Sequence, residues 1–232
     1  MFAKTALIYS KTIGVDCEIS DYSIIYENAL LGRSVFVGEH AVIGREPRPT
    51  SAIVREIKKA GTTIIGDYCS ISAHAVVYSG VSIGPNTLIG DSSSIMPDVS
   101  IGEQVLISRN VTINSDVVIG SYTRIMDNSH ITGRTRIGNH VFISVGVISA
   151  NDNAFGGKGF CKNVKGQIIE DYASIGVGVV LLPSIKLGFG CIVAAGSVVK
   201  KDVDPETIVA GNPAAFVCRV PKHLGRYLKE KT

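Results

Sequence analysis

An aliphatic residue recurs at every sixth position along most of the chain. The period holds without interruption from Ile65 to Ile143, and the same spacing occurs before it, from Leu7 to Ile43, and after it, from Ile169 to Val199. A small or β-branched residue follows each aliphatic one by four positions through the central run. Neither an α-helix, with a period of 3.6, nor a strand, with a period of two, produces a strict period of six.

A longer period is superimposed on the hexads. Ile-Gly pairs recur every eighteen residues, at Gly66, Gly84, Gly102, Gly120 and Gly138. Three hexads therefore complete one coil, and each hexad supplies a short strand and a corner. We predict an all-β fold in which about nine triangular coils stack into a prism with three parallel sheets. The aliphatic residue points inward, and Gly, Asn or Asp take the turn positions.

Two segments interrupt the hexads within a β-helix predicted over residues 1–204. The segment 49–63 could close over an anionic ligand or lie in solvent, because basic residues gather in and beside it: Arg45, Arg48, Arg55, Lys58 and Lys59. The Gly-rich segment 150–167 is a second protruding loop, and long loops in compact repeats are often functional. Residues 205–232 are predicted to cap the prism and to end in a short basic amphipathic helix over 221–232.

Composition excludes several classes of protein. With 45% apolar residues the chain is not disordered, and with 6% aromatic residues and evenly spread Lys and Arg it lacks the basic, aromatic stripe of a nucleic-acid binder. Five scattered cysteines favour a reduced environment over a disulfide framework. The chain shows neither an apolar leader nor an uncharged apolar run of membrane-spanning length, so we expect a cytoplasmic protein with no membrane or nucleic-acid partner.

The hexads, together with AAGSVVKKD at 194–202 and AGNPA at 210–214, resemble the left-handed β-helix, or hexapeptide-repeat, acyltransferases. This resemblance covers nearly the whole chain and implies a left-handed helix, a homotrimer and acetyl-CoA as acyl donor, bound between neighbouring prisms. It places the pantetheine arm and the phosphates of the coenzyme along the last coils, at Val177, Ala195, Lys200, Lys201 and Arg219. Extended amides suit a ladder of edge amides and carbonyls, and phosphates need cations.

The histidine that serves as base in well-known members of the family is missing at both usual positions. One of them is Gly133 here, and the loop before the last coils begins with residues 151–153, Asn-Asp-Asn. The nearest candidates for catalysis are His130 on the outer strand face, Asn128 at the corner before it, and Asn151 and Asp152. Because Asn151 follows Gly133 by eighteen residues, it is predicted to stack over this patch. Asn128 could equally belong to a structural asparagine ladder with Asn110.

The other histidines are weaker candidates. His40, His74 and His140 occupy the corner position of their hexads, and His223 lies in the tail. The carbonic anhydrase branch of this fold needs two histidines five residues apart and a third about two coils earlier, a spacing that does not occur here. We therefore expect no metal site.

The missing base indicates the class of nucleophile. An alcohol generally needs a positioned base, whereas an amine with a pKa near that of an α-amino group, about 8, has a useful free-base fraction at pH 7. The segments MDNSHI and SANDN resemble the nucleotide-linked amino-sugar N-acetyltransferases, although Ala154-Phe155-Gly156-Gly157 replaces the Tyr-Pro-Arg usual there. We expect N-acetylation of a nucleotide-linked amino sugar. O-acetylation of a sugar or small alcohol, and a non-catalytic assembly subunit, remain alternatives.

Overall fold

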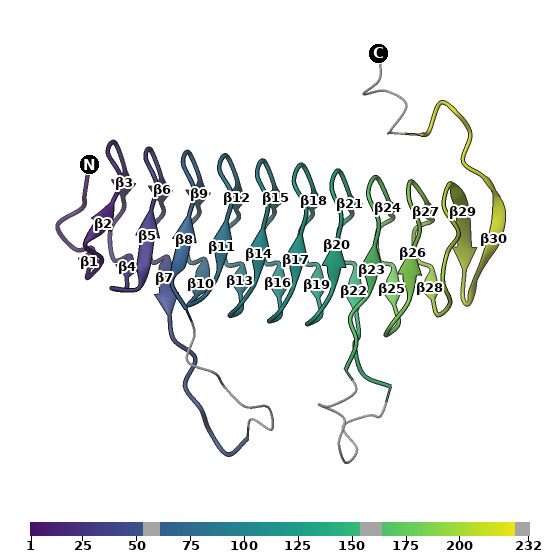
Figure 1. Ribbon diagram of the computed structural model, residues 1–232, viewed down its shortest axis with the longest axis horizontal. Helices are drawn as coiled ribbons and strands as arrows, with labels where there is room; N and C mark the ends of the chain where they lie inside the picture. The colour runs from purple at the N-terminus through teal and green to yellow at the C-terminus, as the bar shows by residue number, and fades with distance from the viewer. Residues whose placement is uncertain (53–60, 154–163, 226–232) are drawn as a thin grey trace.

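The computed structural model describes residues 1–52, 61–153 and 164–225. Their strands form three sheets that run the length of a prism, with β1 and β30 toward opposite ends of it (Figure 1). Sheet 1 has ten strands, sheet 2 nine and sheet 3 eleven, and every third strand of the chain from β1 to β28 joins the same sheet. The prediction of about nine coils was slightly low, and the all-β, parallel, triangular architecture is confirmed.

The strands are short, and most contain two residues. Sheet 1 consists of β1 (Leu7–Ile8), β4 (Ile24–Ile25), β7 (Val42–Arg45), β10 (Val76–Tyr78), β13 (Ser94–Ile95), β16 (Thr112–Ile113), β19 (His130–Ile131), β22 (Ile148–Ser149), β25 (Val180–Leu181) and β28 (Val198–Val199). Sheet 2 consists of β2 (Thr12–Ile13), β5 (Ala29–Leu31), β8 (Thr63–Ile65), β11 (Ser82–Ile83), β14 (Ser100–Ile101), β17 (Val118–Ile119), β20 (Arg136–Ile137), β23 (Ile168–Ile169) and β26 (Lys186–Leu187). Sheet 3 consists of β3 (Glu18–Ile19), β6 (Phe36–Val37), β9 (Ser70–Ile71), β12 (Leu88–Ile89), β15 (Leu106–Ile107), β18 (Arg124–Ile125), β21 (Phe142–Ile143), β24 (Ser174–Ile175), β27 (Ile192–Val193), β29 (Thr207–Gly211) and β30 (Ala214–Arg219).

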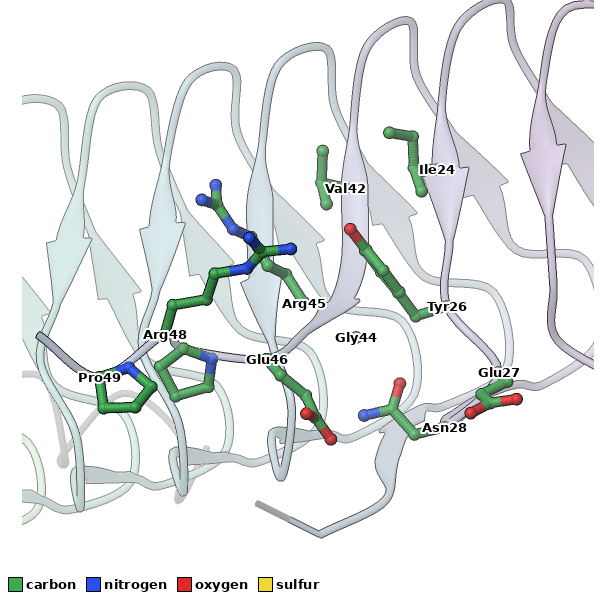
Figure 2. Close-up of a pocket in the computed structure, with 11 residues that line it drawn as sticks. Ile24, Tyr26, Glu27, Asn28, Val42, Gly44, Arg45, Glu46, Arg48 and Pro49 are labelled. Atoms are coloured by element: carbon green, nitrogen blue, oxygen red, sulfur yellow. The ribbon is translucent and has the colours of Figure 1, made fainter. Parts of the chain in front are cut away.

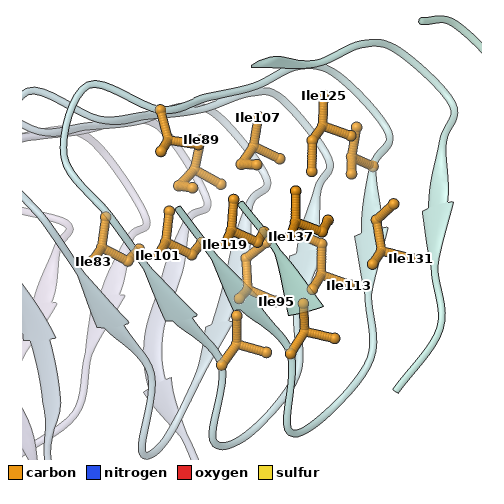
Figure 3. Close-up of a cluster of buried hydrophobic side chains, with 14 of the residues drawn as sticks. Ile83, Ile89, Ile95, Ile101, Ile107, Ile113, Ile119, Ile125, Ile131 and Ile137 are labelled. Atoms are coloured by element: carbon orange, nitrogen blue, oxygen red, sulfur yellow. The ribbon is translucent and has the colours of Figure 1, made fainter. Parts of the chain in front are cut away.

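The hexad-initial aliphatic residues fill the interior of the prism. They stack in register from coil to coil, as Ile83 does on Ile101 and Ile101 on Ile119, and all three are at most 3% exposed. Figure 3 shows these isoleucines converging from the strands of the three sheets on one continuous core. Burial of each such side chain contributes about 1.5–3 kcal/mol before entropy losses, so the repeat itself drives folding.

The corners explain the other recurring hexad positions. Thr87 donates a hydrogen bond from Oγ1 to the carbonyl of Gly102, 3.1 Å away on the next coil, and accepts one from the N–H of Val105. A Cβ at Gly84 would stand 2.6 Å from the backbone of Gly102, which explains the glycine of the Ile-Gly pairs. Small hydroxyl residues and close-packed glycines therefore join consecutive coils.

Both protruding loops leave the prism at the corner between sheet 1 and sheet 2, and their bases lie on the same side of the molecule (Figure 1). The first loop departs after Arg45 and returns at Thr63, so it begins earlier than the predicted residue 49. The second departs after Ser149 and returns at Ile168. Arg55, Lys58 and Lys59 lie outside the described residues.

The C-terminal cap is a hairpin. Strand β29 continues sheet 3, and β30 turns back to pair with it in the antiparallel sense. The helix expected over 221–232 is absent from its described part, where the N–H groups of Leu224 and Gly225 bond to the carbonyl of Pro221 in a turn. A glycine at this point disfavours helix continuation. Residues 226–232 lie outside the described residues. In the part of the chain that is described, no helix is long and apolar enough to cross a membrane.

Candidate functional site

His130 is the first residue of β19 and lies half-buried on the outer face of sheet 1. Its strand neighbours are Thr112 in β16 and Ile148 in β22. The Nδ1 atom is 2.7 Å from Oγ1 of Thr112, and burial lowers the pKa of the imidazole below its ordinary value of 6.5. The ring is therefore mostly neutral at pH 7. If Nδ1 carries the proton and donates to Thr112, Nε2 is left to accept one.

Asn128 occupies the corner between sheet 3 and sheet 1, and its φ of 60° places it in the left-handed region. Asn110 has the same conformation one coil earlier, with a φ of 55°. Asparagine tolerates this region better than most residues, so the backbone explains the asparagine ladder. The side chain of Asn128 is exposed at this corner.

Asp127, which the sequence analysis missed, binds the preceding coil. Its carboxylate accepts hydrogen bonds from the hydroxyl of Ser108 and the N–H of Arg109 and pairs with the Arg109 guanidinium at 2.6 Å. Ser108 and Arg109 together lower the pKa of this carboxyl to about 2. The eighteen-residue spacing of Arg109 and Asp127 is the signal that could have identified the pair.

Asn151 stacks over Gly133, as predicted. Its Nδ2 donates to the carbonyl of Gly133 at 3.3 Å, one coil below. This corner follows β19, whereas Asn128 lies at the corner that precedes it. Asn151 and the half-buried Asp152 therefore stand on one side of the His130 strand and Asn128 on the other.

Gln167, a second residue missed from the sequence, closes the base of the second loop. It is fully buried, and its Nε2 donates to the carbonyls of Ala150, at 2.6 Å, and Leu182, at 2.9 Å. Its Oε1 accepts a hydrogen bond from Thr135. The two ends of the loop are thus tied together beside Asn151. A polar residue at a position that hexads reserve for small residues was the available signal.

The corner that carries Asn128 becomes bare toward the C-terminus. Its next left-handed positions are Gly146, Gly178 and Gly196, and a Cβ built on any of them would have no atom within 4 Å. Val177 and Ala195, expected to contact the coenzyme, are exposed at this corner, and the N–H of Gly196 bonds to the carbonyl of Val177. We call this row, from Gly146 to Gly196, the glycine track.

The three cations assigned to the coenzyme phosphates lie at the C-terminal end of the prism. Lys200 and Lys201 are exposed directly after β28 in sheet 1. Arg219 ends β30 in sheet 3 and donates to the carbonyl of Pro205 at 3.0 Å. The two lysines therefore follow the last strand of sheet 1, the sheet that carries His130.

The remaining histidines stack at corners. Tyr22, His40 and His74 form one stack, with ring centroids 5.1 and 4.9 Å apart, and His140 stands between Tyr122 and Tyr172 in another. His223 is exposed in the C-terminal turn. Among the described residues, no three His, Cys, Asp or Glu side chains gather in a way that could hold a metal ion.

Known proteins share the repeat. Residues 80–115 match the family model of the bacterial transferase hexapeptide (six repeats), and residues 167–201 match the hexapeptide repeat of succinyl-transferase. A 2,3,4,5-tetrahydropyridine-2,6-dicarboxylate N-acetyltransferase of Clostridium perfringens is 45% identical over 65 residues, which are 28% of this chain and 26% of that protein. Serine acetyltransferase 4 of Arabidopsis thaliana is 51% identical over 49 residues, 21% of this chain and 14% of that protein. The chain thus aligns with only 26% of the length of the first and 14% of the length of the second.

Solved structures share the whole architecture. The UDP-N-acetylglucosamine acyltransferase of Arabidopsis superposes with a TM-score of 0.76 over 98% of this chain and 77% of its own, at 19% identity. That of Francisella novicida gives 0.63 over 100% and 73%, also at 19% identity. Likeness at this identity establishes the fold, including its left-handed sense. The chain therefore carries hexapeptide repeats at residues 80–115 and 167–201 and has the left-handed β-helix fold that is also seen in the UDP-N-acetylglucosamine acyltransferases.

Proposed function

We propose that this protein transfers an acetyl group from acetyl-CoA to the amino group of a sugar carried on a nucleoside diphosphate. The observation that carries the proposal is the half-buried imidazole of His130 near the start of the glycine track, with Gly133 in place of the usual histidine. The partial sequence matches to an N-acetyltransferase and the fold of the nucleotide-sugar acyltransferases support it.

The reaction is a direct acyl transfer. The amine attacks the thioester carbonyl, a C–N bond forms, and the C–S bond breaks as coenzyme A leaves as the thiolate. Nε2 of His130 accepts the proton lost by the amine, while Nδ1 donates to Thr112, which holds the ring in the required tautomer. Because burial keeps the imidazole neutral at pH 7, it is available as an acceptor.

The neighbouring residues orient the acceptor. Asp152 holds the ammonium form or a sugar hydroxyl, and a backbone N–H near Asn151 faces the developing oxyanion. Asn128 contacts the acceptor from the opposite corner. The bond from Asn151 to Gly133 and the ties of Gln167 hold this side in place.

Acetyl-CoA follows the glycine track. The absence of side chains at Gly146, Gly178 and Gly196 leaves this corner uncovered, so the pantetheine arm can lie against the backbone beside Val177 and Ala195. Lys200, Lys201 and Arg219 meet the phosphates. A second copy of the chain closes the groove in a homotrimer, which also covers apolar side chains exposed on the sheets, among them Ile148 and Ile168, each 52% exposed. We place the protein in the cytoplasm, where acetyl-CoA is available.

A panel of nucleotide-linked sugars that differ only in an amine or a hydroxyl tests the proposal. We expect release of free thiol from acetyl-CoA with amines alone. His130→Ala should lower kcat at least tenfold and leave KM for acetyl-CoA within about twofold. His74→Ala, which replaces a corner histidine, should change neither kcat nor KM. Failure to bind acetyl-CoA would favour a non-catalytic assembly subunit.

O-acetyl transfer is the second candidate, because the contact between His130 and Thr112 also suits a full general base. Turnover with hydroxyl acceptors alone, abolished by His130→Ala, would establish it in place of the first.

A further inference from the structure

A hollow lies on the outer face of sheet 1, far from His130. It measures 680 Å³ and lies under the departing first loop, between strands β4 and β7 and residues Arg45–Pro49 (Figure 2). Strands β10, β13 and β16 stand between β7 and β19, so four strand spacings, about 19 Å, separate this hollow from His130. It is therefore a separate site.

A missing side chain creates the hollow. Ile8, Ile25, Ile43 and Val77 pair in register across four successive sheet 1 strands. The residues that directly follow them are Tyr9, Tyr26, Gly44 and Tyr78, so Gly44 interrupts a row of tyrosines. Gly44 has a φ of 84°, and the pairing of β7 with β10 shifts by one residue there, so that Tyr78 stands opposite Arg45. A Cβ at Gly44 would lie 2.5 Å from Oδ1 of Asn28.

Two guanidinium groups line one side of the hollow. Those of Arg45 and Arg48 extend toward the same side of the site in Figure 2, and Arg45 also lies 5.7 Å from the ring centre of Tyr78. Within the described ranges, neither arginine forms an ion pair with a carboxylate. Because no carboxylate is paired with them, both guanidinium groups are available to a ligand with two or more negative charges, and guanidinium pairs match phosphate oxygens in geometry.

The opposite side is built to bind neutral polar groups. Asn28 lies beneath Gly44, and both polar atoms of its side chain are buried without a hydrogen-bond partner among the described residues. A buried amide of this kind is rare and costs stability unless something pairs with it. Glu27 and Glu46 line the same side, and carboxylates are good acceptors for sugar hydroxyls.

An apolar extension adjoins the hollow. A space of 370 Å³ is lined by Leu7, Tyr9, Ile24, Tyr26 and Glu27, the last three of which also line the main hollow. Tyr9 and Tyr26 are 55% and 37% exposed, with ring centroids 6.3 Å apart. Exposed aromatic faces beside a phosphate-binding pair are suited to a planar base.

We propose that this hollow binds a nucleoside diphosphate. The base stacks on Tyr26 in the apolar extension, the ribose hydroxyls bond to Glu27, and the two phosphates lie on Arg45 and Arg48. This order, aromatic, acidic and then cationic, matches the order of groups along such a ligand. The nucleoside diphosphate comes either from a nucleotide-linked sugar or from the adenosine part of coenzyme A. The inference is independent of catalysis at His130.

Calorimetric titration of the 232-residue chain with UDP, ADP and pyrophosphate tests the site. We expect the His130→Ala variant still to bind one nucleoside diphosphate per chain. Arg45→Met combined with Arg48→Met should weaken it at least tenfold, and Tyr26→Leu should weaken it at least fivefold while pyrophosphate binding stays unchanged. Tighter binding of UDP than of ADP identifies the nucleotide-linked sugar as the source, and the reverse identifies the coenzyme.

Matched variants elsewhere serve as controls. Arg124→Met removes an exposed cation from sheet 3, and Tyr68→Leu removes an exposed tyrosine outside the row, so neither should change binding. Thermal melts confirm that each variant is folded. Absence of nucleotide binding, or equal affinity in the double arginine variant and the parent, would overturn the proposal. Pyrophosphate binding as tight as that of UDP and ADP would overturn the assignment of a nucleoside.

Discussion

The two loop bases begin at the same corner of the prism but differ in how their polar groups are satisfied. At the second loop, Gln167 is buried and makes hydrogen bonds to Ala150, Leu182 and Thr135. At the first, the two polar atoms of the Asn28 side chain are buried and make none among the described residues. The paired amide of Gln167 holds a fixed geometry by itself, as a reaction centre requires. The unpaired amide of Asn28 leaves a hydrogen-bond donor and acceptor that a ligand can pair with. The same repeat can thus support either a rigid site or a receptive one.

The sharpest test of this difference replaces each amide with an apolar residue. Gln167→Leu leaves two carbonyls unpaired in the interior, so we expect the free energy of unfolding to fall by about 3 kcal/mol. Asn28→Leu removes an amide that is already unpaired, and we expect no loss or a small gain. Urea denaturation of the two variants measures both. Equal losses would show that Asn28 is paired in solution and would remove the contrast.

A methyl group at a loop-base glycine is the next test. Gly44→Ala places a Cβ 2.5 Å from Asn28 Oδ1 at a φ of 84°, so we expect a loss of about 2 kcal/mol and a closed hollow. Gly133→Ala meets its nearest atom, the carbonyl oxygen of Ser115, at 3.0 Å without a positive φ, and we expect a loss below about 1 kcal/mol. Thermal melts give the order of stability of the two variants, and titration with UDP measures whether the hollow can still bind a ligand. A reversed order would contradict this account.

The pH dependence of kcat sharpens the role of His130. Its pKa lies below 6.5 because of burial, and the proposed mechanism requires the neutral ring and a neutral amine. As pH falls below about 8, the logarithm of kcat should decline with slope 1 as the amine is protonated, and below the pKa of His130 with slope 2. His130→Gln should retain only the first slope. A slope that never exceeds 1 in the parent would remove His130 as proton acceptor.

The smallest effect concerns Asp127. Its carboxyl has a pKa of about 2 in the folded state against an ordinary 3.8, so the stability it contributes is present above pH 3.8 and is lost as pH falls toward 2. Asp127→Asn should flatten the acid side of the melting profile slightly. Because the pair with Arg109 is largely exposed, added salt should reduce the difference between the variants. A large loss at neutral pH would indicate a deeper role.

The periodicity predicts the prism because each hexad forms the same short strand and corner and turns the same position inward. Ile101 or Ile119 is inward whatever lies around it, and Asn151 falls over Gly133 by simple addition. Features that break the translation were not predictable in this way. The bulge at Gly44 depends on the pairing of β7 with β10, the tie at Gln167 on where a loop returns, and the final hairpin on the pairing of β29 with β30.

The residues expected to bind coenzyme and acceptor illustrate the same limit. The six- and eighteen-residue spacings give the coil and corner of each of these residues, and Val177 and Ala195 do lie at one corner on successive coils. Counting gave no information about side-chain partners. It could not show that the hydroxyl of Thr112 contacts the imidazole of His130. Nor could it show that the glycines of the glycine track, on three successive coils, leave the space at that corner open.

A stack of nearly identical coils has a weakness that the irregular corner between sheets 1 and 2 removes. Where every coil repeats after eighteen residues, a growing end could dock one full turn out of place and still bury isoleucine on isoleucine. Such a slipped chain would place the Gly44 bulge opposite a regular strand and Gln167 beneath the wrong carbonyls. The bulge and the buried amide thus fix the register of coils that are otherwise nearly identical. They bias assembly of the coils toward a single registration during folding.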